Sequence, residues 1–151
     1  MGDQCEIGYH TGRFVFRVIL PEGYEVVVLP RKKHTDILGA TGKREDHTLG
    51  NLSLLSIYAG KVPSIRIVTD YGCFTVAKKS GRFESFAGMQ ISIIPLAGPL
   101  EVSSRNLKYP MQKLLLKHWY QATLNEALGD SFELDFPAGG ELLIYRTFKG
   151  K

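Results

Sequence analysis

The sequence predicts an α+β fold, a β-rich single domain of antiparallel hairpins with one long helix near the C-terminus and a final hairpin after it. Short apolar and β-branched segments recur along the chain and are separated by glycine and proline turns. One longer segment, residues 110–128, has the apolar spacing of a helix. The chain has 151 residues, 44% of them hydrophobic, so we expect residues 1–151 to share a single core.

Two segments near the N-terminus predict a first hairpin. Arg13–Leu20 carries alternating aromatic and aliphatic residues, and Tyr24–Leu29 is rich in β-branched residues. The Pro-Glu-Gly sequence between them is typical of a turn. Residues 30–50 have little periodicity and several glycines, which predicts a long basic loop. The apolar residues 52–58 fit either a strand or a short helix.

The middle of the chain predicts short strands joined by tight turns. Strands are expected at residues 64–69, 73–77 and 89–94, with a short edge strand at 100–103. The first two strands are expected to form a hairpin around an Asp-Tyr-Gly turn. Residues 78–88 are expected to form a glycine-rich connection between strands.

The segment 110–128 is the strongest helix candidate. Pro110 suits the first turn of a helix, and Gly129 suits the position just after its end. The apolar residues fall on two faces, one with Met111, Leu114, Leu115, Trp119 and Ala122 and the other with Leu116, Tyr120, Leu124 and Ala127.

One of these faces would pack on the core of the domain, and the default partner of the other is the last hairpin. That hairpin is expected from Ser131–Phe136 and Glu141–Thr147. An apolar stripe that stays exposed usually marks a contact surface. We therefore predict a homo-oligomer that forms through helix 110–128, with self-association contacts at Leu116, Tyr120 and Leu124.

Positive charge is concentrated in the middle of the chain. The net charge is +4, and residues 61–117 hold nine basic and three acidic residues, a balance of +6. This asymmetry predicts a polyanionic partner, either nucleic acid or an anionic membrane surface. The predicted polyanion-binding residues are Arg31, Lys32, Lys33, Lys78, Lys79, Arg82, Arg105 and Lys108. Phe83 and Phe86 are predicted aromatic contacts, although filling of the core is the alternative role for at least one of them.

Motifs for catalysis are weak. The glycines at 39 and 42 are too close for a phosphate-binding loop, and no helix pattern follows them. His34-Thr35 and His47-Thr48 are similar to the paired His-x-Thr motifs of two-histidine phosphoesterases, but both pairs fall in the predicted loop. No Cys-x-x-Cys or His-x-x-x-His spacing occurs, so we expect no metal, no cofactor and no catalytic residues.

The two cysteines are too few for a disulfide framework, which favours a reducing compartment. Residues 1–11 include Asp3 and Glu6 and lack an apolar stretch, so we expect no secretory signal. No apolar run approaches the roughly 20 residues that span a bilayer. We therefore expect an intracellular protein, either cytoplasmic or peripheral to a membrane.

The order of the last elements resembles that of the matrix proteins of rhabdoviruses and related negative-strand RNA viruses. The residues that carry the resemblance are Pro110–Leu128, Ser131–Phe136 and Glu141–Lys149. This resemblance implies a viral protein that self-assembles and bridges an anionic membrane to a nucleocapsid. The chain lacks a Pro-Pro-x-Tyr segment, which puts the recruitment of budding factors in doubt.

The sequence thus leads to one main functional hypothesis and two alternatives. The main hypothesis is a non-enzymatic binding and assembly protein that engages a polyanion, with the viral matrix proteins as its nearest analogue. One alternative is a plain nucleic-acid-binding domain. The other is a small, phosphoesterase-like enzyme whose site is built around loop 30–50.

Overall fold

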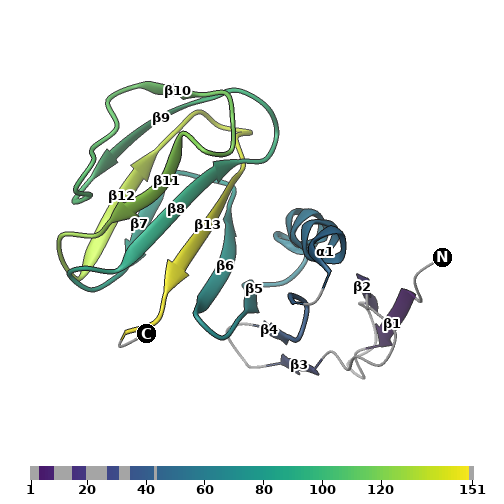
Figure 1. The fold of residues 1–151 in the computed structure, drawn as a ribbon. Coiled ribbons are helices and arrows are strands. Elements are labelled where there is room, and N and C mark those ends of the chain that lie inside the picture. The colour runs from purple at the N-terminus through teal and green to yellow at the C-terminus, as the bar shows by residue number, and fades with distance from the viewer. Residues whose placement is uncertain (1–3, 9–14, 20–26, 31–34, 43, 150–151) are drawn as a thin grey trace. The chain divides into compact units, whose positions relative to one another are not determined.

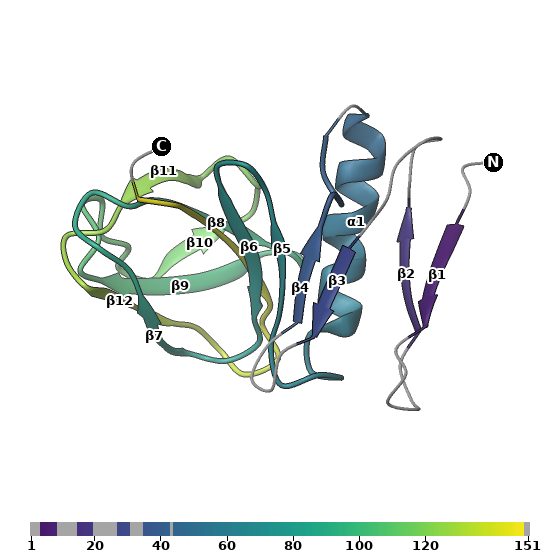
Figure 2. The same ribbon diagram turned by 90° about the horizontal axis from the view of Figure 1, so that it is seen from below.

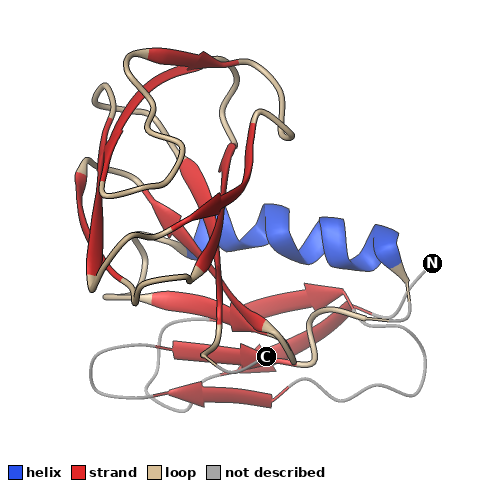
Figure 3. Cartoon of the chain, turned by 60° about the vertical axis from the view of Figure 1, so that its left-hand side comes forward, coloured by secondary structure: helices blue, strands red, loops and turns tan. Residues whose placement is uncertain are grey.

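The structure is a computed structural model that describes residues 4–8, 15–19, 27–30, 35–42 and 44–149. The chain divides into two compact units, residues 1–70 (unit 1) and residues 71–151 (unit 2). The only helix among the described residues belongs to unit 1 (Figure 3). No helix in this described part is both long and apolar enough to cross a bilayer. That the whole chain folds as a single domain stays a prediction.

The described residues of unit 1 form five short strands. They are β1 (Gln4–Gly8), β2 (Val15–Ile19), β3 (Val27–Pro30), β4 (Thr35–Leu38) and β5 (Ile65–Val68). β1 and β2 form an antiparallel pair, β3 pairs antiparallel with β4, and β4 pairs parallel with β5 (Figure 1). The predicted hairpin of residues 13–29 is therefore wrong, because β2 pairs with β1 and β3 pairs with β4.

Helix α1 (Glu45–Tyr58) connects β4 to β5. It runs beside these strands (Figure 2), and its Leu52 and Leu55 are buried. A parallel strand pair needs such a crossover, because the chain must return to the same end of the sheet. The predicted loop 30–50 is thus wrong for residues 35–38 and 45–50, which form β4 and the start of α1.

The start of α1 is held by an exposed ion pair. The Arg44 guanidinium donates to both carboxylate oxygens of Asp46, at 3.1 and 2.6 Å. This hydrogen bonding lowers the pKa of the Asp46 carboxyl group. A charged carboxylate in the first turn also complements the positive end of the helix dipole. The acidic residues 45 and 46 therefore mark the beginning of the helix. The glycines that precede them led to the prediction of a loop at this point.

The part of unit 2 that the structure describes, residues 71–149, forms eight antiparallel strands. They are β6 (Gly72–Ala77), β7 (Gly81–Glu84), β8 (Gln90–Pro95), β9 (Leu100–Arg105), β10 (Leu114–Leu116), β11 (Ala122–Glu126), β12 (Ser131–Asp135) and β13 (Leu142–Thr147). One sheet has the order β10-β9-β12-β7, and the unit 2 strands of the second sheet have the order β11-β8-β13-β6. The strands predicted from residues 73–77, 89–94, 131–136 and 141–147 are confirmed.

The core of unit 2 lies between these two sheets. Inward-facing residues from both sheets form one buried cluster, which includes Ile93 of β8, Phe132 of β12 and Ile144 of β13. The ring of Phe83 in β7 stacks on that of Phe132 with centroids 5.3 Å apart. Side chains on a strand alternate between the two faces of its sheet, so every second residue of these strands enters the cluster.

The predicted final hairpin is wrong in its pairing. β12 pairs with β7 and β9 in one sheet, whereas β13 pairs with β6 and β8 in the other. The predicted short edge strand at 100–103 is the longer strand β9, and it lies between β10 and β12. The chain thus crosses from one sheet to the other between β12 and β13. Both strands contribute apolar residues to the shared core.

The predicted helix 110–128 does not form, and strands β10 and β11 occupy this segment. Lys113 and Leu124 have positive φ angles of 51° and 58°, which a right-handed helix excludes. Between the strands, the side-chain oxygen of Gln121 accepts the backbone N–H groups of Lys117 and His118, at 2.6 and 2.8 Å. The apolar spacing of this segment therefore reflects two strands and a turn, each of which buries a few residues.

Candidate functional site

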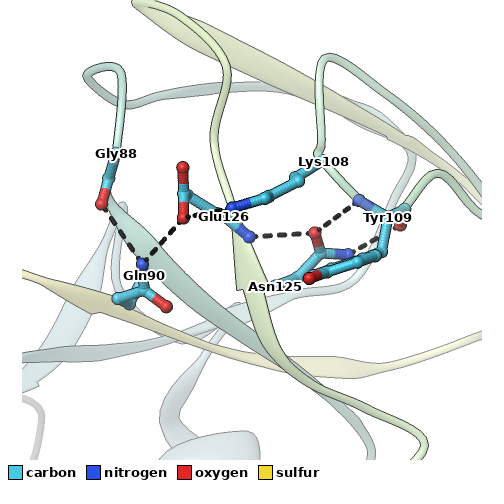
Figure 4. Close-up of polar contacts among 6 residues, drawn as sticks. All are labelled: Gly88, Gln90, Lys108, Tyr109, Asn125 and Glu126. Atoms are coloured by element: carbon cyan, nitrogen blue, oxygen red, sulfur yellow. Dashed lines mark hydrogen bonds and ion pairs between the residues drawn. The ribbon is translucent and has the colours of Figure 1, made fainter.

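A polar network in unit 2 joins three segments that are distant in sequence (Figure 4). Its six residues are Gly88, Gln90, Lys108, Tyr109, Asn125 and Glu126. Backbone hydrogen bonds hold the three segments together, with the Lys108 N–H 2.8 Å from the Glu126 carbonyl oxygen and the Ala127 N–H 2.9 Å from that of Met89. The network is thus built on paired backbone, which keeps its side chains in fixed positions.

Asn125 is the centre of the network. Its side chain is buried, with the residue only 3% exposed. The amide oxygen accepts the N–H groups of Tyr109 and Glu126 at 3.1 and 2.9 Å, and the amide nitrogen donates to the Tyr109 carbonyl oxygen at 2.8 Å. Both backbone polar groups of Tyr109 are therefore satisfied by one side chain, which fixes where Tyr109 sits.

Glu126 places a carboxylate at the edge of the network. One of its oxygens accepts hydrogen bonds from the Gln90 amide and from the Lys108 ammonium group, each at 3.3 Å. Gln90 also donates to the Gly88 carbonyl oxygen at 3.4 Å. The Glu126 side chain is 29% exposed, so the carboxylate is oriented by its neighbours and still meets solvent.

Aromatic and apolar groups accompany this carboxylate. Tyr109 is 61% exposed, and Leu124, next to Asn125 in the chain, is 78% exposed. Leu124 and Asn106 both adopt positive φ angles, 58° and 60°, and such backbone strain in non-glycine residues clusters at ligand sites. The exposed Tyr109 ring can stack on a flat ligand, and the partly exposed Glu126 carboxylate can attract a positively charged one.

The amide of Asn125 yields a direct prediction. Asn125→Ala removes three hydrogen bonds and leaves the backbone groups of Tyr109 without these partners, so we expect the free energy of unfolding to fall by about 1–3 kcal/mol. Chemical denaturation followed by circular dichroism measures this. Asn106→Gly is the control, since the Asn106 amide makes one hydrogen bond, 3.3 Å to the Ser131 carbonyl oxygen, and glycine tolerates the φ of 60° at this position. An equal loss in both variants would contradict the central role of Asn125.

The structure separates the predicted polyanion-binding residues. Arg82 and Arg105 line one groove, Lys108 belongs to the network, and Lys78 forms an ion pair with Glu141 at 2.9 Å. Lys79 is exposed and lies outside both features. Arg31, Lys32 and Lys33 lie outside the described residues. No single basic face forms from the cations that the structure describes, and their role in anion binding stays a prediction.

The predicted aromatic and self-association residues also separate. Phe83 stacks in the core, and Phe86 is partly buried. Leu116 is 0% exposed and belongs to the core cluster, whereas Tyr120 and Leu124 are largely exposed. The predicted helical stripe of Leu116, Tyr120 and Leu124 is therefore wrong, because these residues lie on two strands and a turn with different orientations.

Sequence reasoning missed Gln90, Tyr109, Asn125 and Glu126. One signal was available, because an asparagine inside a helix competes with the backbone for hydrogen bonds and is disfavoured there. Asn125 lies in the interior of the predicted helix, so its presence there argues against a regular helix in this segment. Within the described ranges, no three His, Cys, Asp or Glu side chains gather in an arrangement that could hold a metal ion.

Residues 72–145 match a sequence model of the family described as thiamin pyrophosphokinase, substrate-binding domain. The matched residues lie within unit 2 and include the whole network. A search of curated proteins found no match.

Solved structures of similar fold carry related names. The thiamine pyrophosphokinase of Bacillus subtilis has a TM-score of 0.68 and 24% identity, over 79% of this chain and 57% of its own. The enzyme of Candida albicans has a TM-score of 0.67 and 18% identity, over 76% and 44%. That of Geobacillus thermodenitrificans has a TM-score of 0.61 and 27% identity, over 77% and 54%. The chain therefore shares their fold and spans between 44% and 57% of their length.

These findings correct the functional predictions. The resemblance to viral matrix proteins is wrong, because the family match and the similar structures are thiamin pyrophosphokinases. The non-enzymatic assembly protein with a nucleic-acid or membrane partner is contradicted by the same match, and so is an oligomer through helix 110–128, a helix that does not form. Neither alternative, the phosphoesterase-like enzyme or the plain nucleic-acid-binding domain, is supported. In place of all of these, the comparisons give a match of residues 72–145 to the thiamin pyrophosphokinase substrate-binding domain and a fold shared with solved pyrophosphokinases.

Proposed function

We propose that unit 2 binds thiamin through the network centred on Asn125. The observation that carries this proposal is the coincidence of the family match, residues 72–145, with the unit that holds the network. The name of the matched family specifies a substrate-binding domain and the substrate thiamin.

The chemistry of the network agrees with this ligand. Thiamin has an aminopyrimidine ring and a thiazolium ring that carries a permanent positive charge. The exposed Tyr109 ring offers a surface for stacking either ring, and stacking or cation–π contact typically contributes about 0.5–2 kcal/mol. The Glu126 carboxylate offers an acceptor for the amino group or a counter-charge for the thiazolium ring.

The proposal concerns binding and not the transfer of a diphosphate group. This chain spans 57% of the length of the Bacillus subtilis enzyme and 44% of the length of the Candida albicans enzyme. The match to the family also lies within unit 2. The intracellular location that the sequence favours also stays a prediction.

Titration with thiamin tests the proposal. The single tryptophan, Trp119, lies in unit 2 and gives an intrinsic fluorescence signal, which calorimetry should accompany. We expect Tyr109→Ala to weaken thiamin binding by about threefold to thirtyfold, as the loss of one stacking contact implies. Tyr109→Phe keeps the ring and should bind almost as the wild type does.

Tyr71→Ala is the matched control for Tyr109→Ala, because Tyr71 is a tyrosine of unit 2 that is 68% exposed and outside the network. We expect this variant to bind thiamin as the wild type does. Glu126→Gln should weaken binding as well, since it removes the negative charge and retains the shape. A wild-type chain that shows no thiamin binding at millimolar concentration would overturn the proposal.

A further inference from the structure

Exposed apolar side chains gather in one segment of unit 2. Among the described residues, seven of the eleven large hydrophobic side chains that are exposed fall in residues 109–128. Four of the seven lie on strand β10 and the turn that follows it, namely Leu114, Leu115, Trp119 and Tyr120, and we call these four the β10 surface. Such a concentration of exposed apolar groups usually marks a site of contact with another molecule.

The backbone beneath the β10 surface is held in place. Leu116, the last residue of β10, is 0% exposed and fixes the strand to the core. In the turn, the side-chain oxygen of Gln121 accepts the N–H groups of Lys117 and His118. The rings of His118 and Tyr120 stack with their planes 6° apart. The aromatic residues of the turn are thus presented in fixed positions, which lowers the entropic cost of using them as anchors for a partner.

Strand β10 also has a free edge. It pairs with β9 on one side and has no neighbour on the other side among the described strands (Figure 1). An edge strand with exposed apolar side chains is a template for pairing with a further extended chain, which gains backbone hydrogen bonds and apolar contacts together. The geometry of β10 therefore favours a partner that binds in an extended conformation.

A lysine stands at each end of this strand. Lys113 directly precedes β10 and Lys117 directly follows it, and no aspartate or glutamate occurs in residues 106–125. Both lysines are exposed, and within the described part of the chain neither ammonium group has a hydrogen bond or an ion pair. In the ladder with β9, the only carboxylate opposite β10 is that of Glu101, which faces Leu115. The two ends of β10 are therefore positively charged, and its middle is apolar.

We propose that the β10 surface binds an extended, acidic segment of another protein, which pairs with the free edge of β10 and covers its apolar side chains. The lysines at both ends of the strand specify the partner further, because charge complementarity places acidic residues on either side of a short apolar run. This inference stands independently of thiamin binding, because it uses none of the network residues.

A second copy of this chain is a poorer partner for the same edge. Antiparallel pairing of two β10 strands in full register places Lys113 of one copy opposite Lys117 of the other, at both ends of the pair. Like charges directly opposite each other in a sheet are destabilising. An acidic segment from a different protein avoids this repulsion.

Selection from a phage-displayed library of random peptides, with the whole chain as the target, tests the chemistry of the partner. Random segments of about ten residues suffice, since ordinary strands are rarely longer. We expect the enriched peptides to carry aspartate or glutamate on both sides of a short apolar run. Enrichment of peptides with no preference for acidic residues, or no enrichment at all, would overturn the proposal.

Fluorescence anisotropy with the most enriched peptide then locates its binding site. We expect Lys113→Ala with Lys117→Ala to weaken binding by about twofold to thirtyfold at low salt, as the loss of two exposed ion pairs implies. Leu115→Ser should also weaken binding, because it removes apolar area that the peptide covers. These three side chains are exposed, so the variants should fold as the wild type does. Glu101→Gln should strengthen binding, because it removes a repulsive charge.

Two controls match these variants. Lys79→Ala with Lys149→Ala removes two exposed cations that do not flank β10, and Leu128→Ser changes an exposed leucine that does not belong to the β10 surface. We expect both controls to bind the peptide as the wild type does. Equal weakening in the controls and in the variants of the β10 surface would contradict the proposal, as would weaker binding by Glu101→Gln.

Two further measurements distinguish other occupants of the β10 surface. Analytical ultracentrifugation of the wild type and Leu115→Ser should show the same oligomeric state. A wild-type dimer that Leu115→Ser dissociates would assign the surface to a second copy and overturn the proposal. Sedimentation with phosphatidylserine vesicles should show no binding that depends on Leu115, and such binding would assign the surface to a membrane instead.

Discussion

Phe132→Ala is expected to lower the free energy of unfolding of the chain by about 3–5 kcal/mol, the usual cost of deleting a buried aromatic side chain. Phe132 is 0% exposed and lies in the middle of the cluster between the two sheets. Its ring also stacks on Phe83 at 5.3 Å, a contact that the variant loses. Because β12 pairs on both sides, the backbone cannot move inward to fill the cavity that the variant leaves.

Thermal and chemical denaturation of wild type and variant measure this loss. Phe148→Ala is the matched control, because it deletes the same atoms from a side chain that is 38% exposed. We expect the control to cost about 2–3 kcal/mol at most, in proportion to the smaller apolar area that it buries, and less where the partly exposed site leaves no cavity. A similar cost at both positions would show that the cluster around Phe132 is not the core on which unit 2 depends.

Gly72→Ala is expected to destabilise the chain by about 3 kcal/mol, at the upper end of the cost of overfilling a packed site. A Cβ atom at Gly72 would lie 2.2 Å from the carbonyl oxygen of Arg146 and 2.9 Å from the ring of Tyr145. The nearest of these atoms is backbone, and it is part of the β6–β13 ladder. The clash can therefore be relieved only by a shift of the strand pair.

Gly81→Ala provides the comparison for Gly72→Ala. Gly81 also lies in a strand, β7, but a Cβ atom there meets nothing within 4 Å. We expect this variant to be neutral or slightly stabilising, since alanine reduces the freedom of the unfolded chain by about 0.4–1 kcal/mol. If both variants were neutral under chemical denaturation, the close approach of β6 and β13 at Gly72 would be contradicted.

The sequence predicted the strands of unit 2 well where each is bounded by a turn. Residues 73–77, 89–94 and 141–147 are apolar runs between glycines or prolines, and each forms a strand. Which strands pair with one another could not be predicted in the same way. Pairing within each sheet depends on contacts between residues far apart in the chain, such as Thr75 and Ile144, and no local pattern specifies them.

The helix was predicted in the wrong place for identifiable physical reasons. In residues 110–128 the apolar spacing satisfied a helical period, although it arises from β10, a turn and β11. The left-handed conformations of Lys113 and Leu124, which break any helix, are unexpected for these residue types. In α1 the apolar side chains lie mostly in the second half, so residues 45–50, which start with two acidic residues and contain Leu49 as their one aliphatic residue, gave little periodic signal.

The candidate site escaped prediction because its groups come from three segments. Gln90, Tyr109 and Glu126 meet only once β8 and β11 have paired, and no pair of them is close in sequence. Charge counting drew attention to Arg82 and Arg105, which do share one groove. It could not show that Lys78 is paired with Glu141. Isolated cations in a sequence therefore carry little information until their partners are known.

The position of β13 determines when unit 2 can be completed during synthesis. β13 is the last strand of the unit, and it lies between β8 and β6 in the middle of its sheet. During synthesis, β6 and β8 leave the ribosome before β13, which lies about 50 to 70 residues further along the chain. Until β13 pairs with them, each of these two strands has an unpaired edge. Such long-range pairing is slow, so the edges of β6 and β8 that β13 later covers are the aggregation-prone parts of the incomplete unit.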